Sequence, residues 1–255
     1  FFTKIQFLLL HLVLFSCVWS KSFLILAPMI KKEQDPMGQA MYHYFHYNDT
    51  TSIKVNTNIT EGEELPVPYL FRKYSEMPFL EKEALRFVKG KVLDVGAGSG
   101  AHSLYLQDNG FDVTSIDVSE LSCELMKEQG LKNVICKDIW TFETEAYDTI
   151  MFMMNGIGLV KNLEGLQIFL EYIKSFLAPT GQILLDSSDI KYMFYDDEGG
   201  LWVDMNSAYY GELEYQLTYK HYTAAPFPWL FVDFDRLRNI AIKCGWTVEL
   251  IYEDD

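Results

Sequence analysis

The sequence has few features of metal-binding, disulfide-bonded or nucleic-acid-binding proteins. Its four cysteines are scattered along 255 residues, with no C-x-x-C pair and no cluster of cysteine and histidine. This pattern indicates neither a metal site nor a disulfide framework, and it is typical of reduced thiols in a cytoplasmic protein. Acidic residues outnumber lysine and arginine by 36 to 21, and no run of basic residues follows residue 32. Because a net charge of −15 repels phosphate backbones, nucleic acid is not expected as a partner.

A long apolar stretch lies at the N-terminus. Residues 1–28 resemble the apolar part of a signal peptide or a membrane anchor, but a histidine and a lysine interrupt them and no small-residue cleavage site follows. A third interpretation is upstream sequence translated in frame, with Met29 or Met37 as the natural start. We favour this interpretation, so a membrane partner is expected only if residues 1–28 are a true anchor. In every case residues 1–30 are predicted to lie outside the fold.

Residues 92–100 are the most informative part of the chain. Residues 91–95 predict a buried strand and residues 101–107 the start of a helix, with glycines at 96, 98 and 100 between them. A strand, a tight glycine turn and a helix N-terminus form a binding loop of the nucleotide type, and glycine lets a ligand approach the backbone closely. Asp94, two residues before the first glycine, suits a cationic group such as an α-amine and disfavours a pyrophosphate. The alternate spacing also differs from the G-x-G-x-x-G fingerprint of dinucleotide-binding proteins.

From residue 91 onwards, strand-like and helix-like segments alternate. Strands are predicted at 91–95, 111–117, 134–136, 147–152, 182–186 and 246–252. This order predicts an α/β fold with a doubly wound, mostly parallel, Rossmann-like sheet. Residues 187–232, rich in aromatic and acidic residues, interrupt the alternation and are interpreted as an inserted lid. Within them, residues 212–219 have the pattern of an exposed strand that pairs with residues 229–232.

The pattern Asp94-Val95-Gly96-Ala97-Gly98-Ser99-Gly100 resembles motif I, D/E-x-G-x-G-x-G, of the class I S-adenosylmethionine-dependent methyltransferases. The resemblance covers residues 88–186, and it implies S-adenosylmethionine as the cofactor and methyl transfer by in-line displacement. It implies that the glycine loop holds the methionine part, and that Asp117, at the end of the second strand, accepts hydrogen bonds from the ribose hydroxyls. Residues 138 and 139 are expected beside adenine, and residues 153–158 next to the sulfonium. The cofactor-binding residues that the resemblance implies are Asp94, Gly96, Ala97, Gly98, Gly100, Asp117, Val118, Asp138, Ile139, Met154 and Asn155.

The resemblance also gives expectations for the ends of the chain and for its domains. Class I methyltransferases have a seventh, antiparallel strand after the sixth, and no residues remain here to form one, so we expect a C-terminus that lacks the last strand. An N-terminal flap and helix are predicted at residues 31–88, followed by the methyltransferase domain at residues 89–255 with its insertion at about 187–232. Four aromatic residues of the flap either cover the ligand or pack as core: Tyr42, His43, Tyr44 and His46.

Several polar residues near the expected site allow two interpretations. Asp186 and Asp189 follow the fifth strand, where either could orient a substrate or take a proton, or could cap the next segment. Arg72 could bind the methionine carboxylate or be an ordinary surface arginine. No catalytic residue is assigned, because methyl transfer needs mainly orientation and desolvation, and a base only if the nucleophile arrives protonated.

The predicted function is methyl transfer to an unknown acceptor, which we expect to be a small molecule. The sequence lacks the Asn/Asp-Pro-Pro-aromatic motif of the DNA amino-methyltransferases. This absence, together with the negative charge, argues against methylation of nucleic acid at nitrogen. Two alternatives stay open. An NAD(P)-dependent oxidoreductase would share the fold but is disfavoured by Asp94 and the glycine spacing, and a non-catalytic protein could keep both the fold and the cofactor.

Overall fold

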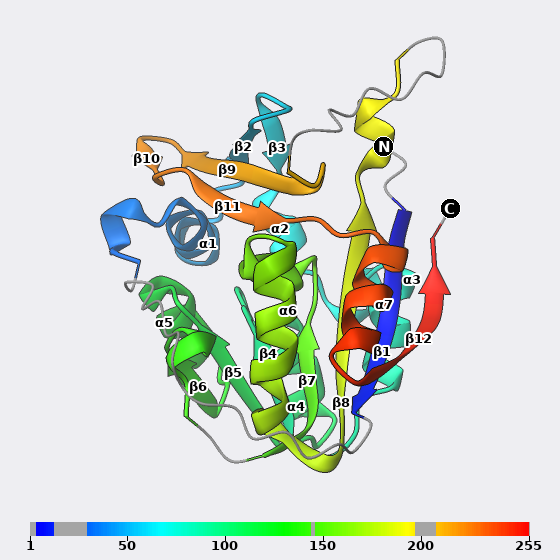
Figure 1. Ribbon diagram of the computed structural model, residues 1–255. Helices are drawn as coiled ribbons and strands as arrows, with labels where there is room; N and C mark the ends of the chain where they lie inside the picture. Colours follow the sequence, from blue (N-terminus) through cyan, green and yellow to red (C-terminus); the bar gives the residue numbers. More distant parts are fainter. Residues whose placement is uncertain (1–3, 13–29, 144–145, 197–207, 255) are drawn as a thin grey trace.

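The structure is a computed structural model that describes residues 4–12, 30–143, 146–196 and 208–254. Its central feature is a seven-stranded sheet with the strand order β12-β1-β8-β7-β4-β5-β6 (Figure 1). The strands that follow the glycine motif are β4 (Val92–Val95), β5 (Val113–Asp117), β6 (Asn133–Cys136), β7 (Tyr147–Phe152), β8 (Leu177–Asp189) and β12 (Trp246–Glu253). The β4–β5, β4–β7, β5–β6 and β7–β8 pairs are all parallel. These six strands match the six predicted segments, so the predicted Rossmann-like α/β fold is confirmed.

Different helices cover the two faces of this sheet. The helices are α6 (Leu163–Tyr172) and α7 (Phe234–Lys243) on one face, and α3 (Phe79–Arg86) and α4 (Ala101–Asp108) on the other. Leu93 of β4 packs with the first pair, whereas its neighbour Val92 packs with the second. Because successive residues of a strand point to opposite faces, the continuous apolar runs in the sequence fill both cores. Helix α5 (Glu120–Glu128) follows β5 and packs against β5 and β6.

The prediction that residues 1–30 lie outside the fold is wrong for residues 4–12. They form β1 (Lys4–Leu12), which lies between β8 and β12 and is antiparallel to both (Figure 1). Phe7, Leu8 and Leu10 are completely buried. A short apolar run fits a strand buried on both faces as well as it fits a membrane segment, so its composition could not separate the two. The antiparallel strand that we expected to be missing after β12 is therefore supplied by the N-terminal segment, of which residues 1–3 and 13–29 lie outside the described residues.

A second, antiparallel sheet lies over the carboxyl ends of the parallel strands (Figure 1). It consists of β2 (Ile53–Thr57), β3 (Glu63–Leu65), β9 (Glu212–Tyr219), β10 (Tyr222–Thr223) and β11 (Phe227–Leu230). The predicted pairing within the insertion is confirmed, since β11 pairs with β9. Strand β2 also pairs with β9, so the N-terminal flap and the insertion build one sheet together. Residues 197–207 of the insertion lie outside the described residues.

Helix α1 (Pro36–Tyr47) and the short helix α2 (Val67–Leu70) connect this second sheet to the main one. Asp35 caps α1 by accepting a hydrogen bond from the Gly38 N–H at 2.8 Å, with proline at the first helical position. Helix α1 packs on α5 and on β9. In the part of the chain that the structure describes, no helix has the length and apolar character needed to cross a membrane.

Candidate functional site

The glycine loop joins β4 to α4 at the carboxyl edge of the sheet. Its three glycines all have positive φ angles, +71° at Gly96, +58° at Gly98 and +82° at Gly100, which L side chains rarely adopt. A Cβ atom at Gly96 would meet nothing within 4 Å, and one at Gly98 would meet only the Gly96 carbonyl at 4.0 Å. A Cβ at Gly100 would instead lie 2.7 Å from the Leu131 side chain. Gly96 and Gly98 therefore border open space, whereas Gly100 has to be glycine because a side chain there would collide with Leu131. Ala97, between Gly96 and Gly98, donates its backbone N–H to the Ile116 carbonyl at 3.2 Å.

Asp94, the acid of the motif, is buried inside the fold. Its Oδ2 accepts a hydrogen bond from the Ser103 hydroxyl at 2.7 Å, and that hydroxyl accepts one from Ser115 at 2.7 Å. Burial raises the pKa of Asp94, while the nearby His102 and the Ser103 bond oppose this shift. The Asp94–Ser103 bond therefore links β4 to the first turn of α4 and stabilises the glycine loop between them.

Asp117 holds the loop from the neighbouring strand. Its Oδ2 accepts the Gly98 N–H and its Oδ1 accepts the Ser119 N–H, both at 2.9 Å. Burial raises the pKa of Asp117 to about 6, with a smaller contribution from the carboxylate of Asp35. Val118 beside it is half-buried. The carboxylate still has free acceptor capacity, because two oxygens offer about four lone-pair directions.

Asp138 and Ile139 follow β6 at the same edge. Asp138 Oδ1 accepts the Trp140 N–H at 2.9 Å and caps a short 3-10 helix, Ile139–Thr141. The Ile139 side chain is 4% exposed and belongs to the main core. The structure therefore brings these residues to the edge that holds the glycine loop, with the Ile139 side chain beneath that edge.

The loop after β7 is strained and connects three elements. Met154 and Asn155 both have left-handed φ angles, 58° and 56°, which are uncommon outside glycine. The Asn155 N–H donates to Asp186 Oδ2 on β8 at 2.7 Å, and its Nδ2 donates to the Leu230 carbonyl on β11 at 3.2 Å. Met154 is 40% exposed beside this junction.

The two acids of β8 differ sharply in their surroundings. Asp189 Oδ1 accepts hydrogen bonds from the Lys191 N–H and the Tyr210 hydroxyl, both at 2.8 Å, so it caps the following turn. Asp186 is 4% exposed, and its Oδ1 has no hydrogen-bond partner among the described residues. Burial raises the pKa of Asp186 to about 6, and the neighbouring Glu81 adds to this shift. Of the two interpretations made from sequence, capping fits Asp189 and not Asp186.

A buried ion cluster lies under the site and was missed by sequence reasoning. Arg72 is 5% exposed and pairs with Glu81 through Nε at 3.1 Å and through Nη2, so it is not a surface arginine. His102 Nε2 lies 2.8 Å from Glu81 Oε2. Although burial acts to raise the pKa of Glu81, its bonds to His102 and Arg72 lower that pKa overall. The available signal was an acid on the apolar face of the predicted helix, three residues before Ala84 and four before Leu85.

The aromatic residues of α1 contact neighbouring helices and the second sheet. His43 Nδ1 lies 3.2 Å from the Tyr219 hydroxyl of β9, and the Tyr44 ring lies 4.9 Å from that of Phe71. His46 Nε2 lies 3.3 Å from Glu128 of α5, and the Tyr42 and His46 rings are tilted against each other with their centroids 4.2 Å apart. These contacts favour the interpretation of the aromatic group as packing between α1, α2, α5 and the second sheet.

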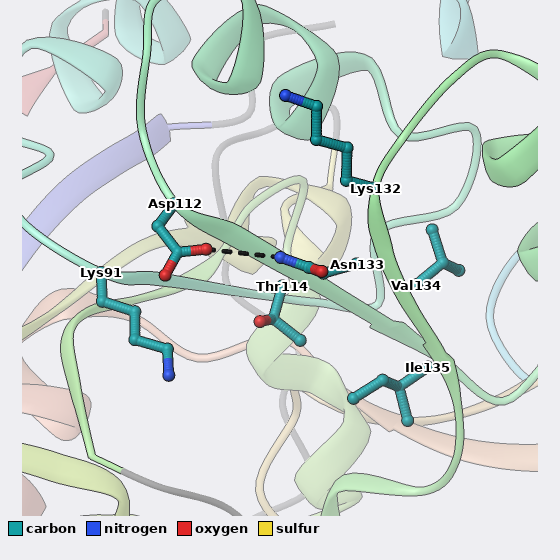
Figure 2. A pocket seen from close by; sticks show the side chains of 7 residues that line it. All are labelled: Lys91, Asp112, Thr114, Lys132, Asn133, Val134 and Ile135. Atoms are coloured by element: carbon teal, nitrogen blue, oxygen red, sulfur yellow. Dashed lines mark hydrogen bonds between the residues drawn. The ribbon is translucent and has the colours of Figure 1, made fainter.

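A groove of about 460 Å³ lies elsewhere, at the amino ends of β4, β5 and β6 (Figure 2). Its lining residues are Lys91, Asp112, Thr114, Lys132, Asn133, Val134 and Ile135. Figure 2 shows the Asn133 amide pointing to Asp112, to which it donates at 3.3 Å. The groove contains none of the predicted site residues. Ligands of open α/β sheets bind at the opposite, carboxyl ends of the strands, where the glycine loop and Asp117 lie.

Comparisons with known proteins agree with the geometry of the carboxyl edge. Residues 69–235, more than half of the chain, match the protein family described as a methyltransferase domain. The chain is 38% identical to an S-adenosylmethionine-dependent methyltransferase from Bacteroides fragilis, solved in complex with S-adenosyl-L-homocysteine. The match covers 86% of this chain and 89% of that one, with a TM-score of 0.79.

A shorter similarity links the chain to a curated protein. Over 60 residues it is 42% identical to a 23S rRNA (uracil(747)-C(5))-methyltransferase from Pyrococcus horikoshii. This stretch is 23% of the present chain and only 15% of that relative. S-Adenosylmethionine is the cofactor of the family that these comparisons share, which decides against an NAD(P)-dependent oxidoreductase. With its motif I loop, its sheet order and these matches, the chain belongs to the family of S-adenosylmethionine-dependent methyltransferases.

Proposed function

We propose that this protein transfers the methyl group of S-adenosylmethionine to a small-molecule acceptor. The observation that carries the proposal is the open space beside Gly96 and Gly98, at the carboxyl end of β4 and beneath the second sheet. A methyl donor needs close backbone approach at this point, and the positive φ angles of both glycines permit it.

The proposed cofactor contacts follow from the site residues. Asp94 and the loop of Gly96, Ala97, Gly98 and Gly100 would hold the methionine part, with Asp117 at the ribose. Val118, Asp138 and Ile139 would lie beside adenine, and Met154 and Asn155 near the sulfonium. The cofactor supplies an activated methyl group, so the protein has to orient the two reactants and exclude water.

Three observations support a small acceptor rather than a nucleic acid. The net charge of −15 opposes a phosphate backbone. The second sheet lies directly over the carboxyl edge, since a Cβ at Gly158 would come 2.2 Å from the Trp229 ring nitrogen. The similarity to the rRNA enzyme covers only 15% of that protein. We further infer a cytoplasmic location, which the free thiols of Cys123, Cys136 and Cys244 support.

Calorimetric titration with S-adenosylhomocysteine and with NAD tests the cofactor part of this proposal. We expect saturable binding of the first and no heat from the second. Incubation with S-adenosylmethionine and either a small-molecule library or total RNA, with release of S-adenosylhomocysteine as the readout, tests the acceptor part. Tight NAD binding, or turnover only with RNA, would overturn the proposal.

A further inference from the structure

Asp186 is a buried carboxylate with an unused oxygen. Its Oδ2 accepts the Asn155 N–H at 2.7 Å, but its Oδ1 has no partner in the described part of the chain. The side-chain oxygen of Asn155 is also buried and unpartnered, and it is identified as the oxygen because Nδ2 donates to Leu230. Buried polar atoms are nearly always hydrogen-bonded in native proteins, so two adjacent residues with unmet acceptors require an explanation.

Both residues lie at the functional edge of the sheet. Asp186 follows Leu185, the residue that ends the pairing of β8 with β7. A Cβ at Gly156, next to Asn155, would come 3.8 Å from the carbonyl oxygen of Val95, the residue before the glycine loop. Asn155 therefore lies one strand away from the proposed methionine part of the cofactor and Asp186 two strands away, both on the side away from the ribose position at Asp117.

The charges around Asp186 leave its carboxylate without a cation. The Arg72 guanidinium is used by Glu81, and His102 also bonds to Glu81. The charged groups that act on Asp186 are Glu81, which raises its pKa, and His102, which lowers it. Among the described residues no lysine or arginine forms an ion pair with it, and a buried charge without a partner is costly.

We propose that Asp186, assisted by the side-chain oxygen of Asn155, binds the amino group of the methyl acceptor, which is therefore a primary or secondary amine. This inference rests on the proposed methyltransferase function. An amine in its protonated form brings a positive charge and at least two N–H donors, whereas a hydroxyl brings no charge and one donor. Of these two acceptor types, only the amine can satisfy both unmet acceptors and neutralise the carboxylate.

The same contact accounts for the proton that leaves the nitrogen. The bound ammonium group gives one proton to Asp186, which frees the electron pair on nitrogen. That pair forms the bond to the methyl carbon while the carbon–sulfur bond breaks, and its electrons stay on sulfur as a neutral thioether. The methylated amine leaves as an ammonium ion, and Asp186 returns its proton to water before the next turnover.

The test compares Asp186→Asn with Asp189→Asn in the full chain. Asp189 lies on the same strand and caps a turn, so its variant controls for loss of a β8 carboxylate. The probes are small primary and secondary amines, each compared with the alcohol of the same carbon skeleton. Their affinity is measured by titration into protein saturated with S-adenosylhomocysteine, and their turnover is measured with S-adenosylmethionine. We expect wild type and Asp189→Asn to prefer amines, and Asp186→Asn to lose about tenfold or more in amine affinity, as for loss of a charge-assisted hydrogen bond.

The pH dependence adds a readout that a structural role would not change. Amine affinity of the wild type should fall as pH drops below about 6, where Asp186 gains a proton, and Asp186→Asn should lack this step. The other titratable groups near Asp186 are Glu81, His102 and Tyr69, and they are retained in the variant. If the wild type binds S-adenosylhomocysteine normally but shows no preference for amines, or binds no amine at all, this inference is overturned and the proposed function is not. Failure of the wild type to bind S-adenosylhomocysteine would overturn the proposed function instead.

Discussion

The acidic residues on the two halves of the carboxyl edge, the β4–β5 side and the β7–β8 side, differ in their hydrogen bonding. On the β4–β5 side, Asp94 and Asp117 accept hydrogen bonds from hydroxyl and backbone donors of the protein itself. On the β7–β8 side, Asp186 and Asn155 keep unpartnered oxygens. The first half is therefore already organised to hold a ligand of fixed shape, whereas the second keeps binding capacity for a group that must come from outside. This difference separates the proposed cofactor position from the proposed acceptor position.

The largest expected effect comes from removing the arginine of the buried ion cluster that lies beneath the site. Arg72→Ala should destabilise the protein by about 3–5 kcal/mol, because Glu81 would stay buried without its guanidinium partner. Arg86→Ala is the control, since its pair with Glu83 at 2.9 Å is exposed and should contribute about 0–1 kcal/mol. Chemical unfolding followed by circular dichroism measures both. Equal effects of the two substitutions would show that the buried ion cluster of Arg72, Glu81 and His102 does not stabilise the protein.

The next effect differs in size between the two halves. The raised pKa of about 6 means that the folded protein binds a proton to Asp186 more tightly than the unfolded chain does. The stability that this proton contributes is therefore fully present below about pH 4, and up to about 3 kcal/mol is lost as pH rises through about 6. Asp186→Asn should abolish this loss and stabilise the ligand-free protein at pH 7.5, with little gain at pH 4.

Asp117→Asn should stabilise the protein less than Asp186→Asn does, although the pKa of Asp117 is also about 6. Its carboxylate accepts backbone N–H groups with both oxygens, and an amide would turn its NH₂ group towards one of them. We expect the lost hydrogen bond to offset about 1–3 kcal/mol of the gain at pH 7.5. Thermal unfolding of both variants between pH 4 and 8 measures the pair, and an equal gain in stability from the two variants would contradict the distinction between the halves.

A smaller effect is expected from closing the open face of the glycine loop. Gly98→Ala adds a methyl group where the ligand should approach, and its φ of +58° disfavours alanine. Gly110→Ala is the matched control, because Gly110 also has a positive φ, +88°, and open space around it, but lies in the turn before β5. Both should lose about 1–2 kcal/mol of stability. Only Gly98→Ala should weaken S-adenosylhomocysteine binding, by about tenfold or more, in calorimetric titration.

The sequence was informative wherever the signal was local. The glycine loop and the six strands around it depend on short-range patterns, and their positions agree with the structure. The pairing of residues 212–219 with 229–232 could also be predicted, since both segments alternate and lie close together in the chain. Helix α1 was missed although its start, Asp35 followed by Pro36, is a recognisable helix-capping signal.

What could not be predicted depends on contacts between distant segments. Strand β1 pairs with residues more than 170 positions later, and its apolar run gave no indication of that partner. Asp186 and Asp189 are alike in sequence, and only their tertiary neighbours, Asn155 for one and Tyr210 for the other, give them different roles. The position of the glycine loop can thus be predicted from a local motif, whereas the state of each acid depends on long-range packing.

The smallest expected effect concerns the strained loop between the two halves. Met154→Gly should stabilise the protein by about 0.5 kcal/mol, because glycine accepts the φ of 58° and the exposed methionine side chain loses little burial. Asn48→Gly is the control, since asparagine already tolerates the left-handed conformation at the end of α1 and should gain less. If the strain serves to place Asn155 against Asp186, Met154→Gly should also lower turnover with an amine acceptor by a larger factor than it weakens S-adenosylhomocysteine binding. A Met154→Gly variant that is less stable than wild type would mean that the methionine side chain itself holds the loop, and that strain is not what separates the acceptor half from the cofactor half.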